Sequence, residues 1–198
     1  MNRTIVITGA TTGIGAALRE QLQASGDTVI NVDIRDADIV ADLTTAEGRQ
    51  LALAAIRARC PDGINGFVPC AGLGPQYPSL SRITSLNFFA VRELTECLLP
   101  LLKLANGHVV LVASNSASLP GINQDLVQAM LGNNEILTCE LVEKLDGFQA
   151  YGGSKQALVR WMRKLTPVWA KEGVRINAVA PGTTQTPLLQ AGLADPLW

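Results

Sequence analysis

The stretch that decides the fold lies near the start of the chain, TIVITGATTGIGAAL, residues 4–18. A short run rich in β-branched residues leads into Gly9, Gly13 and Gly15, and a helix-like segment follows. Glycine lets a backbone turn tightly and approach a phosphate closely, and the free N–H groups of a helix N-terminus attract anions. The pattern predicts a strand, a turn and a helix, in which the turn either holds a dinucleotide pyrophosphate or is an ordinary connection.

Short apolar runs alternate with longer segments of helical period along the rest of the chain. In residues 46–60, AEGRQLALAAIRARC, apolar residues recur at helical spacing and basic residues stand near the end, which suits a helix C-terminus. Strands that alternate with helices pair in parallel through right-handed crossovers. We therefore expect an α/β fold, a doubly wound parallel sheet of the Rossmann type in three α/β/α layers, as a single domain over residues 1–198. The expected strands are residues 4–8, 28–32, 64–69, 108–113 and 174–179.

Composition excludes several classes of protein. The chain has 198 residues, 47% of them hydrophobic, which is enough for one sizeable core. A net charge of -1 with interspersed acids and bases provides no basic stripe for nucleic acid and no polybasic anchor for a membrane. The N-terminal apolar run is too short for a signal peptide or a membrane span, so we expect a cytoplasmic protein. The 4 cysteines lack paired metal spacing, and we expect reduced thiols and no metal site.

A long segment separates the strand expected at 108–113 from the helix near Tyr151, far longer than the usual connection. Its apolar residues recur at helical spacing, and Gly132, Asn133 and Asn134 interrupt them. We expect a mostly helical insert at about residues 119–149, made of about two helices. The insert either packs beside the substrate site and covers an outer helix, or is a surface elaboration.

Two acidic residues accompany the second expected strand. Asp33 lies at its end, where a carboxylate accepts hydrogen bonds from an adenosine ribose. Such an acid favours NAD, because it would repel a 2′-phosphate, although Arg35 could partly offset that repulsion. The alternative for Asp33 is a solvated turn residue. Asp42 either reaches the adenine or caps the following helix.

Tyr151 and Lys155 stand four positions apart in YGGSK, so on a helix they share one face. A tyrosine ordinarily has a pKa of about 10, and a nearby ammonium stabilises the phenolate. The two residues are therefore either a proton-transfer pair or two side chains on a solvated face. Gly152 and Gly153 are poor helix formers, which is more expected where a ligand comes close than on an idle surface.

A run of serines follows the strand expected at 108–113. Ser114 stands at the carboxyl end of that strand, the edge at which open α/β sheets place their ligands. Its hydroxyl could hold a substrate oxygen. Ser116 and Ser118 are competitors for that role, and the alternative is that the whole run forms a loop.

Taken in order, these residues resemble the short-chain dehydrogenase/reductase family, whose members read TGxxxGxG, Asn-Ala-Gly, Ser, YxxxK and Pro-Gly. The likeness extends from Ile5 to the last residues. Three further segments look like the bacterial 3α-hydroxysteroid dehydrogenase/carbonyl reductases, which also carry a long insert before the tyrosine: VDIRDADIVADLTTAEGR, CAGLGPQ and TPLLQAGLADP. The residues that match the family motifs are Gly9, Gly13, Gly15, Asn87, Ser114, Tyr151, Lys155 and the segment NAVAPGTTQT.

The resemblance implies roles for these residues. Tyr151 would be the general acid/base, Lys155 would stabilise its phenolate and hold the nicotinamide ribose, and Ser114 would position the carbonyl oxygen. Asn87 would support a water-linked proton relay, or else only bridge backbone groups. The implied reaction is NAD(H)-dependent interconversion of a secondary alcohol and a ketone, most closely a 3α-hydroxysteroid and its 3-oxosteroid. The implied NAD-binding residues are Gly9, Thr12, Gly13, Ile14, Gly15, Asp33, Asp42, Leu43, Ala71, Gly72, Tyr151, Lys155, Pro181, Gly182, Thr184 and Thr186.

The sequence departs from the family pattern in two places. Pro69 and Cys70 stand where the family usually has two asparagines, which weakens one cofactor-shaping contact. We also expect the chain to lack the substrate lid, last helix and last strand with which members typically continue. A C-terminally shortened, catalytically weak NAD(H)-binding module that acts through protein contacts is therefore the alternative to an active enzyme on a small-molecule substrate. We further expect a homo-oligomer, with a dimer favoured.

Overall fold

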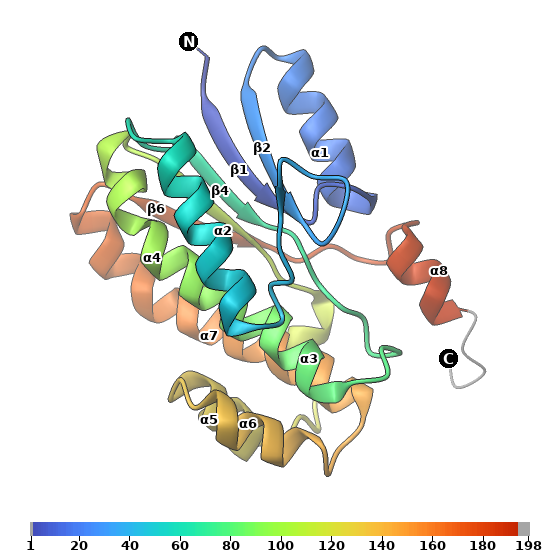
Figure 1. Cartoon of the computed structure of the whole chain (residues 1–198). Helices are drawn as coiled ribbons and strands as arrows, with labels where there is room; N and C mark the ends of the chain where they lie inside the picture. The colour runs from blue at the N-terminus through green and yellow to red at the C-terminus, as the bar shows by residue number, and fades with distance from the viewer. Residues whose placement is uncertain (1, 194–198) are drawn as a thin grey trace.

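The computed structural model describes residues 2–193. A parallel sheet of 6 strands runs through its centre in the order β3-β2-β1-β4-β5-β6 (Figure 1). The strand order reverses beside β1, because successive crossovers run outward from the centre in both directions. The predicted doubly wound fold is confirmed. The strands are β1 (Thr4–Thr8), β2 (Thr28–Asp33), β3 (Ile39–Val40), β4 (Gly66–Pro69), β5 (His108–Val112) and β6 (Arg175–Val179).

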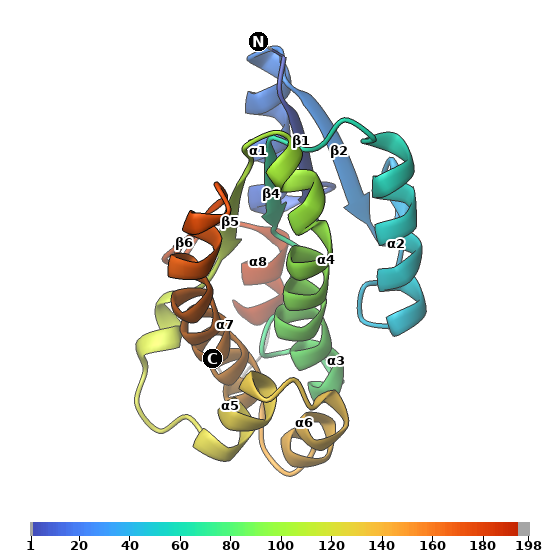
Figure 2. The same ribbon diagram turned by 90° about the vertical axis from the view of Figure 1, so that its left-hand side faces the viewer.

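Helices lie on both faces of the sheet and complete the three predicted layers (Figure 1, Figure 2). One face carries α1 (Gly13–Ala24), and the other carries α2 (Ala46–Arg59), α4 (Val91–Leu104) and α7 (Gly147–Lys171). Successive strand residues point to opposite faces, so Val6 joins the larger core under α2, α4 and α7, whereas Ile5 and Ile7 join the smaller core beside α1. The other helical segments are α3 (Leu80–Thr84), η1 (Ser85–Ala90), η2 (Asn115–Ser118), α5 (Gln124–Leu131), α6 (Glu135–Val142) and α8 (Pro187–Leu193).

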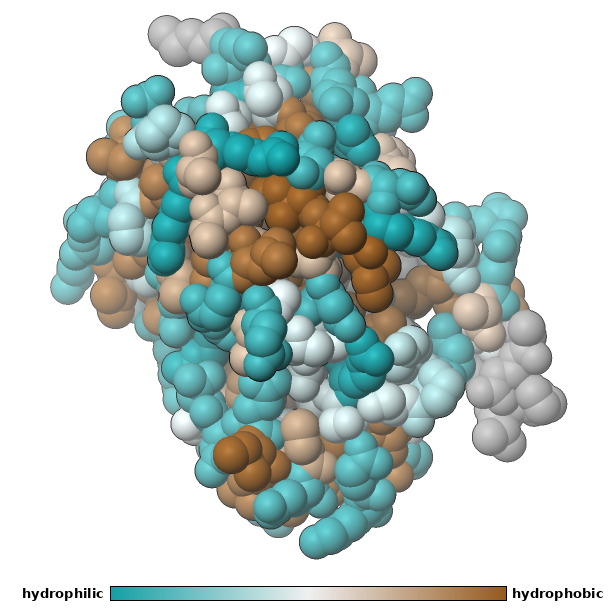
Figure 3. Space-filling model, in the orientation of Figure 1, coloured by the Kyte–Doolittle hydropathy of each residue, from teal (hydrophilic) through white to brown (hydrophobic). Residues whose placement is uncertain are grey.

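The outer surface over α2, α4 and α7 is largely hydrophilic, with a hydrophobic area near its centre (Figure 3). Exposed apolar side chains in this part of the fold include Leu51 on α2 and Val40 on the neighbouring β3. Arg57 and Arg59 stand in the last turn of α2, where cations interact favourably with the helix dipole, as the sequence predicts.

The predicted insert is helical and breaks where expected. α5 and α6 flank Gly132–Asn134, and Asn133 adopts a left-handed conformation with φ of 58°. Leu126 and Met130 of α5 are fully buried and belong to the larger core, as does Val142 of α6. The insert is therefore part of the main core rather than a surface elaboration, and α5 covers α7.

The two glycines beside Tyr151 serve this packing. A Cβ on Gly152 would lie 2.6 Å from Ile122 Cδ1, and one on Gly153 would lie 3.1 Å from Leu126 Cδ2. Both glycines therefore face side chains of the insert. The expectation that they accommodate a ligand is wrong, because the close neighbour is the protein's own α5 region.

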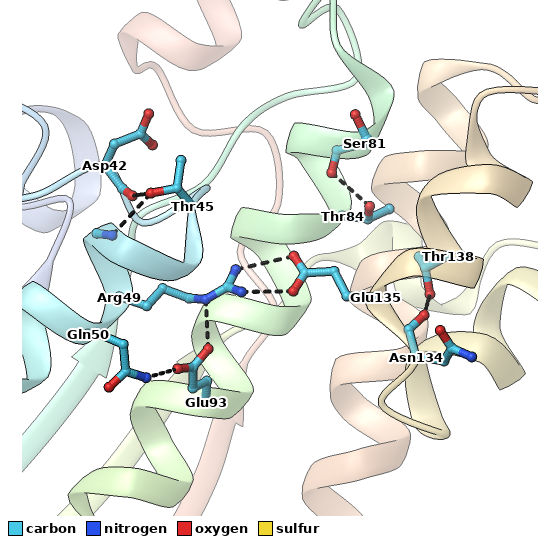
Figure 4. A network of polar contacts seen from close by, with 11 residues as sticks. Asp42, Thr45, Arg49, Gln50, Ser81, Thr84, Glu93, Asn134, Glu135 and Thr138 are labelled. Atoms are coloured by element: carbon cyan, nitrogen blue, oxygen red, sulfur yellow. Dashed lines mark hydrogen bonds and ion pairs between the residues drawn. The ribbon is translucent and has the colours of Figure 1, made fainter.

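A buried cation joins the insert to the helices under the sheet (Figure 4). Arg49 of α2 is 4% exposed, and its Nη2 lies 2.8 Å from Glu135 Oε2 in the first turn of α6. Arg49 Nε lies 2.7 Å from Glu93 Oε2 on α4, and Gln50 Nε2 donates to the other Glu93 oxygen at 2.6 Å. A buried guanidinium requires such partners, so these carboxylates hold α6, α2 and α4 together.

Several short elements were not predicted, among them β3, η1 and α8. β3 is only Ile39–Val40, too short for any periodic pattern. The six residues of η1 form a π-helix between α3 and α4, and π-helical turns are often found at functional sites. α8 follows the Pro-Gly motif, and Gln76 Nε2 donates to the Leu188 carbonyl of this helix at 3.1 Å.

Close backbone packing between the glycine-rich turn and the start of α1 leaves no room for a side chain at Gly15. A Cβ at this position would overlap the Gly9 carbonyl oxygen and lie 2.9 Å from the Gly9 carbonyl carbon, and backbone cannot rotate away. Gly15→Ala should lower the free energy of unfolding by about 1–3 kcal/mol in urea titrations. Gly182→Ala is the control, because a Cβ there meets nothing within 4 Å. Equal unfolding midpoints for the two variants would contradict this packing.

Candidate active site

The residues predicted to act together lie at one edge of the sheet. Because the strands are parallel, the loops after β1, β4 and β5 emerge at their shared carboxyl edge. These loops carry the glycine-rich turn, Cys70–Leu73 and Ser114. The N-terminal half of α7, with Tyr151 and Lys155, packs against η2, which follows Ser114.

The glycine-rich turn has the geometry expected of an anion site. Gly9 and Gly13 have φ of 72° and 60°, conformations that favour glycine. A Cβ on Gly9 would also lie 2.6 Å from Ala71 Cα, so the turn contacts the loop after β4.

Among the described helices, the start of α1 lacks the side-chain cap that four other long helices have; α4 also lacks one, but it continues directly from η1. α2, α5, α6 and α7 begin with side-chain caps from Thr45, Asn123, Asn134 and Asp146. Within the described residues, Thr12 makes no such bond at the start of α1. The N–H groups of the first turn of α1 are therefore not satisfied by a capping side chain, which suits a bound anion.

Asp33 lies half-buried at the end of β2, beside the turn. Its Oδ2 accepts from Thr11 N at 3.0 Å and its Oδ1 from Ile34 N at 2.7 Å. The carboxylate is thus fixed by backbone donors. It is not the freely solvated turn acid of the alternative interpretation.

Asp42 does not cap α2, because Thr45 does so. Its Oδ1 accepts from Thr44 N at 3.0 Å and from Thr44 Oγ1 at 2.6 Å, and its Oδ2 pairs with Arg82. Partial burial alone would raise the pKa of Asp42, but the Thr44 hydrogen bonds and the Arg82 guanidinium outweigh it and hold that pKa below its ordinary value. The neighbouring Leu43 is buried in the core.

Lys155 is the most deeply buried charged group of the predicted set. It is 6% exposed, its Nζ donates to the Val112 carbonyl at 2.8 Å, and the same Nζ lies 5.7 Å from the centre of the Tyr151 ring. Burial lowers the pKa of Lys155 to about 8, and the nearby Cys70 opposes that shift only in part. The predicted shared face of Tyr151 and Lys155 is confirmed, with Lys155 buried and Tyr151 partly buried.

The three serines occupy different environments. Ser114 is half-buried and receives hydrogen bonds from Ser116 N at 3.2 Å and Ser116 Oγ at 2.8 Å. Ser118 is exposed and donates to the Asn115 carbonyl. Val112, the acceptor of Lys155, lies two residues before Ser114, so the chain leads directly from the Lys155 contact to this serine.

Asn87 is fully buried within η1 and bridges backbone groups. Its Oδ1 accepts from Leu73 N and its Nδ2 donates to Leu73 O, both at 2.9 Å. A Cβ on Gly72 would lie 3.2 Å from the same Oδ1. The backbone-bridging interpretation is confirmed, while the proton relay stays a prediction.

The Pro-Gly segment contacts the glycine-rich turn through its last residue, Thr186. Thr186 lies against Gly13, where a Cβ would be 3.4 Å from Thr186 Cγ2. Pro181 is half-buried, and Gly182 and Thr184 are exposed, with Thr184 Oγ1 donating to the Gly182 carbonyl.

Sequence analysis missed several residues that shape this site. Asn31 is fully buried on β2 and binds the glycine-rich turn, and Arg82 of α3 holds Asp42. A lone asparagine within the apolar strand TVINVD is a usable signal for the first residue. Nothing in the local pattern indicates the second.

Two kinds of feature are absent from the described residues, a cluster of metal ligands and a helix that could span a membrane. Across residues 2–193 no group of three or more metal-ligating side chains forms a metal site. Over the same residues no helix has the length and apolar character needed to cross a membrane.

Comparison with known proteins agrees with this geometry. The family model for short chain dehydrogenases matches residues 3–126, and the model described as enoyl-(acyl carrier protein) reductase matches residues 113–196. The chain belongs to the short-chain dehydrogenase/reductase family, as its motifs predicted. It is 46% identical over 199 residues to a 3-alpha-hydroxysteroid dehydrogenase/carbonyl reductase of Comamonas testosteroni, covering 97% of this chain and 77% of that protein.

Other relatives support the same assignment. The coniferyl-alcohol dehydrogenase of Pseudomonas sp. (strain HR199 / DSM 7063) is 30% identical, with 95% of this chain and 75% of that protein covered. The crystal structure of the 3-alpha-hydroxysteroid dehydrogenase from Pseudomonas sp. B-0831 complexed with NADH superposes with a TM-score of 0.96. Its sequence is 42% identical, and the match covers 98% of this chain and 78% of that one.

The burial of Lys155 predicts a pH dependence of stability. Because burial lowers its pKa from 10.5 to about 8, the unfolded chain binds more protons than the folded chain between these values. The Lys155 contribution to the free energy of unfolding should therefore rise with pH over this window, and the cost of burying the ammonium is fully present below it. Urea titrations of the parent and Lys155→Met at about pH 7.5 and 10 measure this. The lowered pKa of Lys155 would be contradicted if the difference in free energy of unfolding between the parent and Lys155→Met were the same at both pH values. It would also be contradicted if the parent became less stable relative to Lys155→Met at the higher pH.

Proposed function

We propose that the chain is an NAD(H)-dependent oxidoreductase that interconverts a secondary alcohol and a ketone. The observation that carries the proposal is the placement of Lys155. Its ammonium is held on the Val112 carbonyl at the end of β5, 5.7 Å from the centre of the Tyr151 ring. Burying a lysine is costly, and among the described residues no carboxylate forms an ion pair with Lys155, while Cys70 opposes the lowered pKa only in part. A role in stabilising a phenolate accounts for that arrangement.

The residues present fit a dinucleotide. The uncapped first turn of α1, including Thr12, Gly13, Ile14 and Gly15, would receive the phosphates through its N–H groups. Asp33 would accept hydrogen bonds from the adenosine ribose, since its position is set by Thr11 N. The NADH bound by the 3-alpha-hydroxysteroid dehydrogenase of similar fold supports NAD(H) as the cofactor.

Other predicted contacts line the same edge. Asp42 and Leu43 would lie beside the adenine, and Ala71 and Gly72 beside the turn. Thr186, which packs on Gly13, would approach the dinucleotide together with the residues before it in the Pro-Gly segment, Pro181, Gly182 and Thr184.

The side chains of this chain would handle the proton. When bound, the nicotinamide supplies or accepts the hydride. Tyr151 would take the hydroxyl proton of the alcohol during oxidation and return a proton to the carbonyl oxygen during reduction. Lys155 would stabilise the phenolate between these events, and Ser114, oriented by Ser116, would hold the substrate oxygen by a hydrogen bond.

The proposed substrates are 3α-hydroxysteroids, 3-oxosteroids and related carbonyl compounds. The support is the 46% identity to the Comamonas testosteroni protein, which is a 3-alpha-hydroxysteroid dehydrogenase/carbonyl reductase. The alternative of a non-catalytic NAD(H)-binding module is not favoured, because such a module would have no use for a lysine buried beside Tyr151.

Tyr151→Phe tests this proposal. Loss of the phenolic hydroxyl should lower turnover of NAD and a 3α-hydroxysteroid by about 100- to 10,000-fold, measured as NADH absorbance, since that is the usual size of acid/base catalysis. NADH binding and the unfolding midpoint should be unchanged.

The chain offers a matched control, because it has only one other tyrosine, Tyr77. Tyr77→Phe also removes one phenolic hydroxyl and should retain turnover. Parent-level activity in Tyr151→Phe, or equal losses in the two variants, would refute Tyr151 as the acid/base.

A further inference from the structure

Asn31 is a polar side chain buried inside the sheet layer, and its hydrogen bonds go to the glycine-rich turn. It lies on β2 and is 0% exposed. Its Oδ1 accepts from Ala10 N at 3.0 Å, and its Nδ2 donates to Thr11 Oγ1 at 3.1 Å. The carboxamide therefore uses both of its groups on two consecutive residues of the turn.

A second contact from β2 completes this attachment. Asp33 points to the same side of the strand as Asn31, two residues later, and its Oδ2 accepts from Thr11 N at 3.0 Å. Thr11 Oγ1 in turn donates to the Arg35 carbonyl at 3.2 Å. The turn is thus fastened to the strand that carries the predicted ribose-binding acid.

These bonds decide which N–H groups of the turn remain available. Gly9 N donates to the Val32 carbonyl, and Ala10 N and Thr11 N donate to the two side chains of β2. The N–H groups from Thr12 into α1 have no capping side chain within the described structure. The N–H groups with acceptors on β2 therefore end at Thr11, and the N–H groups without a capping side chain begin at Thr12.

We propose that Asn31 is a positioning residue for the dinucleotide. By fixing Ala10 and Thr11, it sets the direction in which the following N–H groups point and the distance between them and Asp33. One rigid unit then presents both the phosphate donors and the ribose acceptor. The inference rests on the proposed function, because it names a residue that prepares the same cofactor site without touching the reacting atoms.

The role is distinguishable from a purely structural one. A buried amide that only stabilised the fold would lower the unfolding midpoint and leave the cofactor affinity of the folded chain unchanged. A positioning role weakens the binding of NADH and raises the KM for NAD, while kcat at saturating NAD stays near the parent value.

The experiment compares three variants by fluorescence titration with NADH, urea unfolding and steady-state kinetics. Asn31→Ala should weaken NADH binding by about 10- to 100-fold, the effect of losing two hydrogen bonds that orient the site. Val29→Ala is the matched control, since Val29 lies two residues earlier on the same side of β2 and packs in the core beside α1. It should lower the unfolding midpoint without changing NADH affinity.

Thr11→Val keeps the test decisive if Asn31→Ala folds poorly. Valine retains the shape of threonine but cannot accept from Asn31 Nδ2, so NADH binding should weaken by about 3- to 10-fold. In the double variant, the Thr11 change should add little to the loss caused by Asn31→Ala.

The outcomes distinguish the positioning role of Asn31 from the proposed NAD(H)-dependent function. NADH affinity at the parent level in both Asn31→Ala and Thr11→Val would overturn the positioning role and leave the proposed function intact. An equal loss of affinity in Val29→Ala would also overturn it, because the effect would then follow from stability alone. A folded parent chain that binds no NADH would overturn the proposed function and this inference with it.

Discussion

Close contact between backbone segments at the end of β1 is the constraint on which the site depends. Gly15 at the start of α1 touches the Gly9 carbonyl, and Gly9 touches Ala71 in the loop after β4. β1 lies between β2 and β4, so this turn sits where the strand order reverses. The first turn of α1 and the loop after β4 can approach the end of β1 this closely only because Gly9 and Gly15 carry no side chain.

The part of the candidate site that carries Tyr151 depends on equally specific attachments. Lys155 Nζ ties α7 to the end of β5, and Asn87 ties the π-helix η1 to Leu73. On its other side α7 is held by the insert, whose Ile122 and Leu126 pack on Gly152 and Gly153. Tyr151 therefore projects from a helix that is fixed on two sides, which suits the proposed role in proton transfer.

Most of this architecture follows from sequence patterns, and the failures have identifiable causes. Five of the six strands, the two insert helices and the shared face of Tyr151 and Lys155 were predictable, because each rests on a local period or spacing. Gly152 and Gly153 were misinterpreted because local sequence does not say which neighbour approaches a glycine. The capping alternative for Asp42 failed because Thr45, three residues later, takes that role. The contacts of Asn31, Arg49 and Arg82 span 20 to 86 residues of sequence, beyond what any local pattern reports.

The proposed reaction transfers a hydride between a substrate carbon and a nicotinamide at this site. The most direct measurement incubates the chain with NAD and a 3α-hydroxysteroid deuterated at C3, and then analyses the dinucleotide by mass spectrometry. The account predicts that reduced dinucleotide forms and carries the deuterium at the nicotinamide C4. Folded chain that binds NAD but leaves it oxidised and unlabelled would contradict the account.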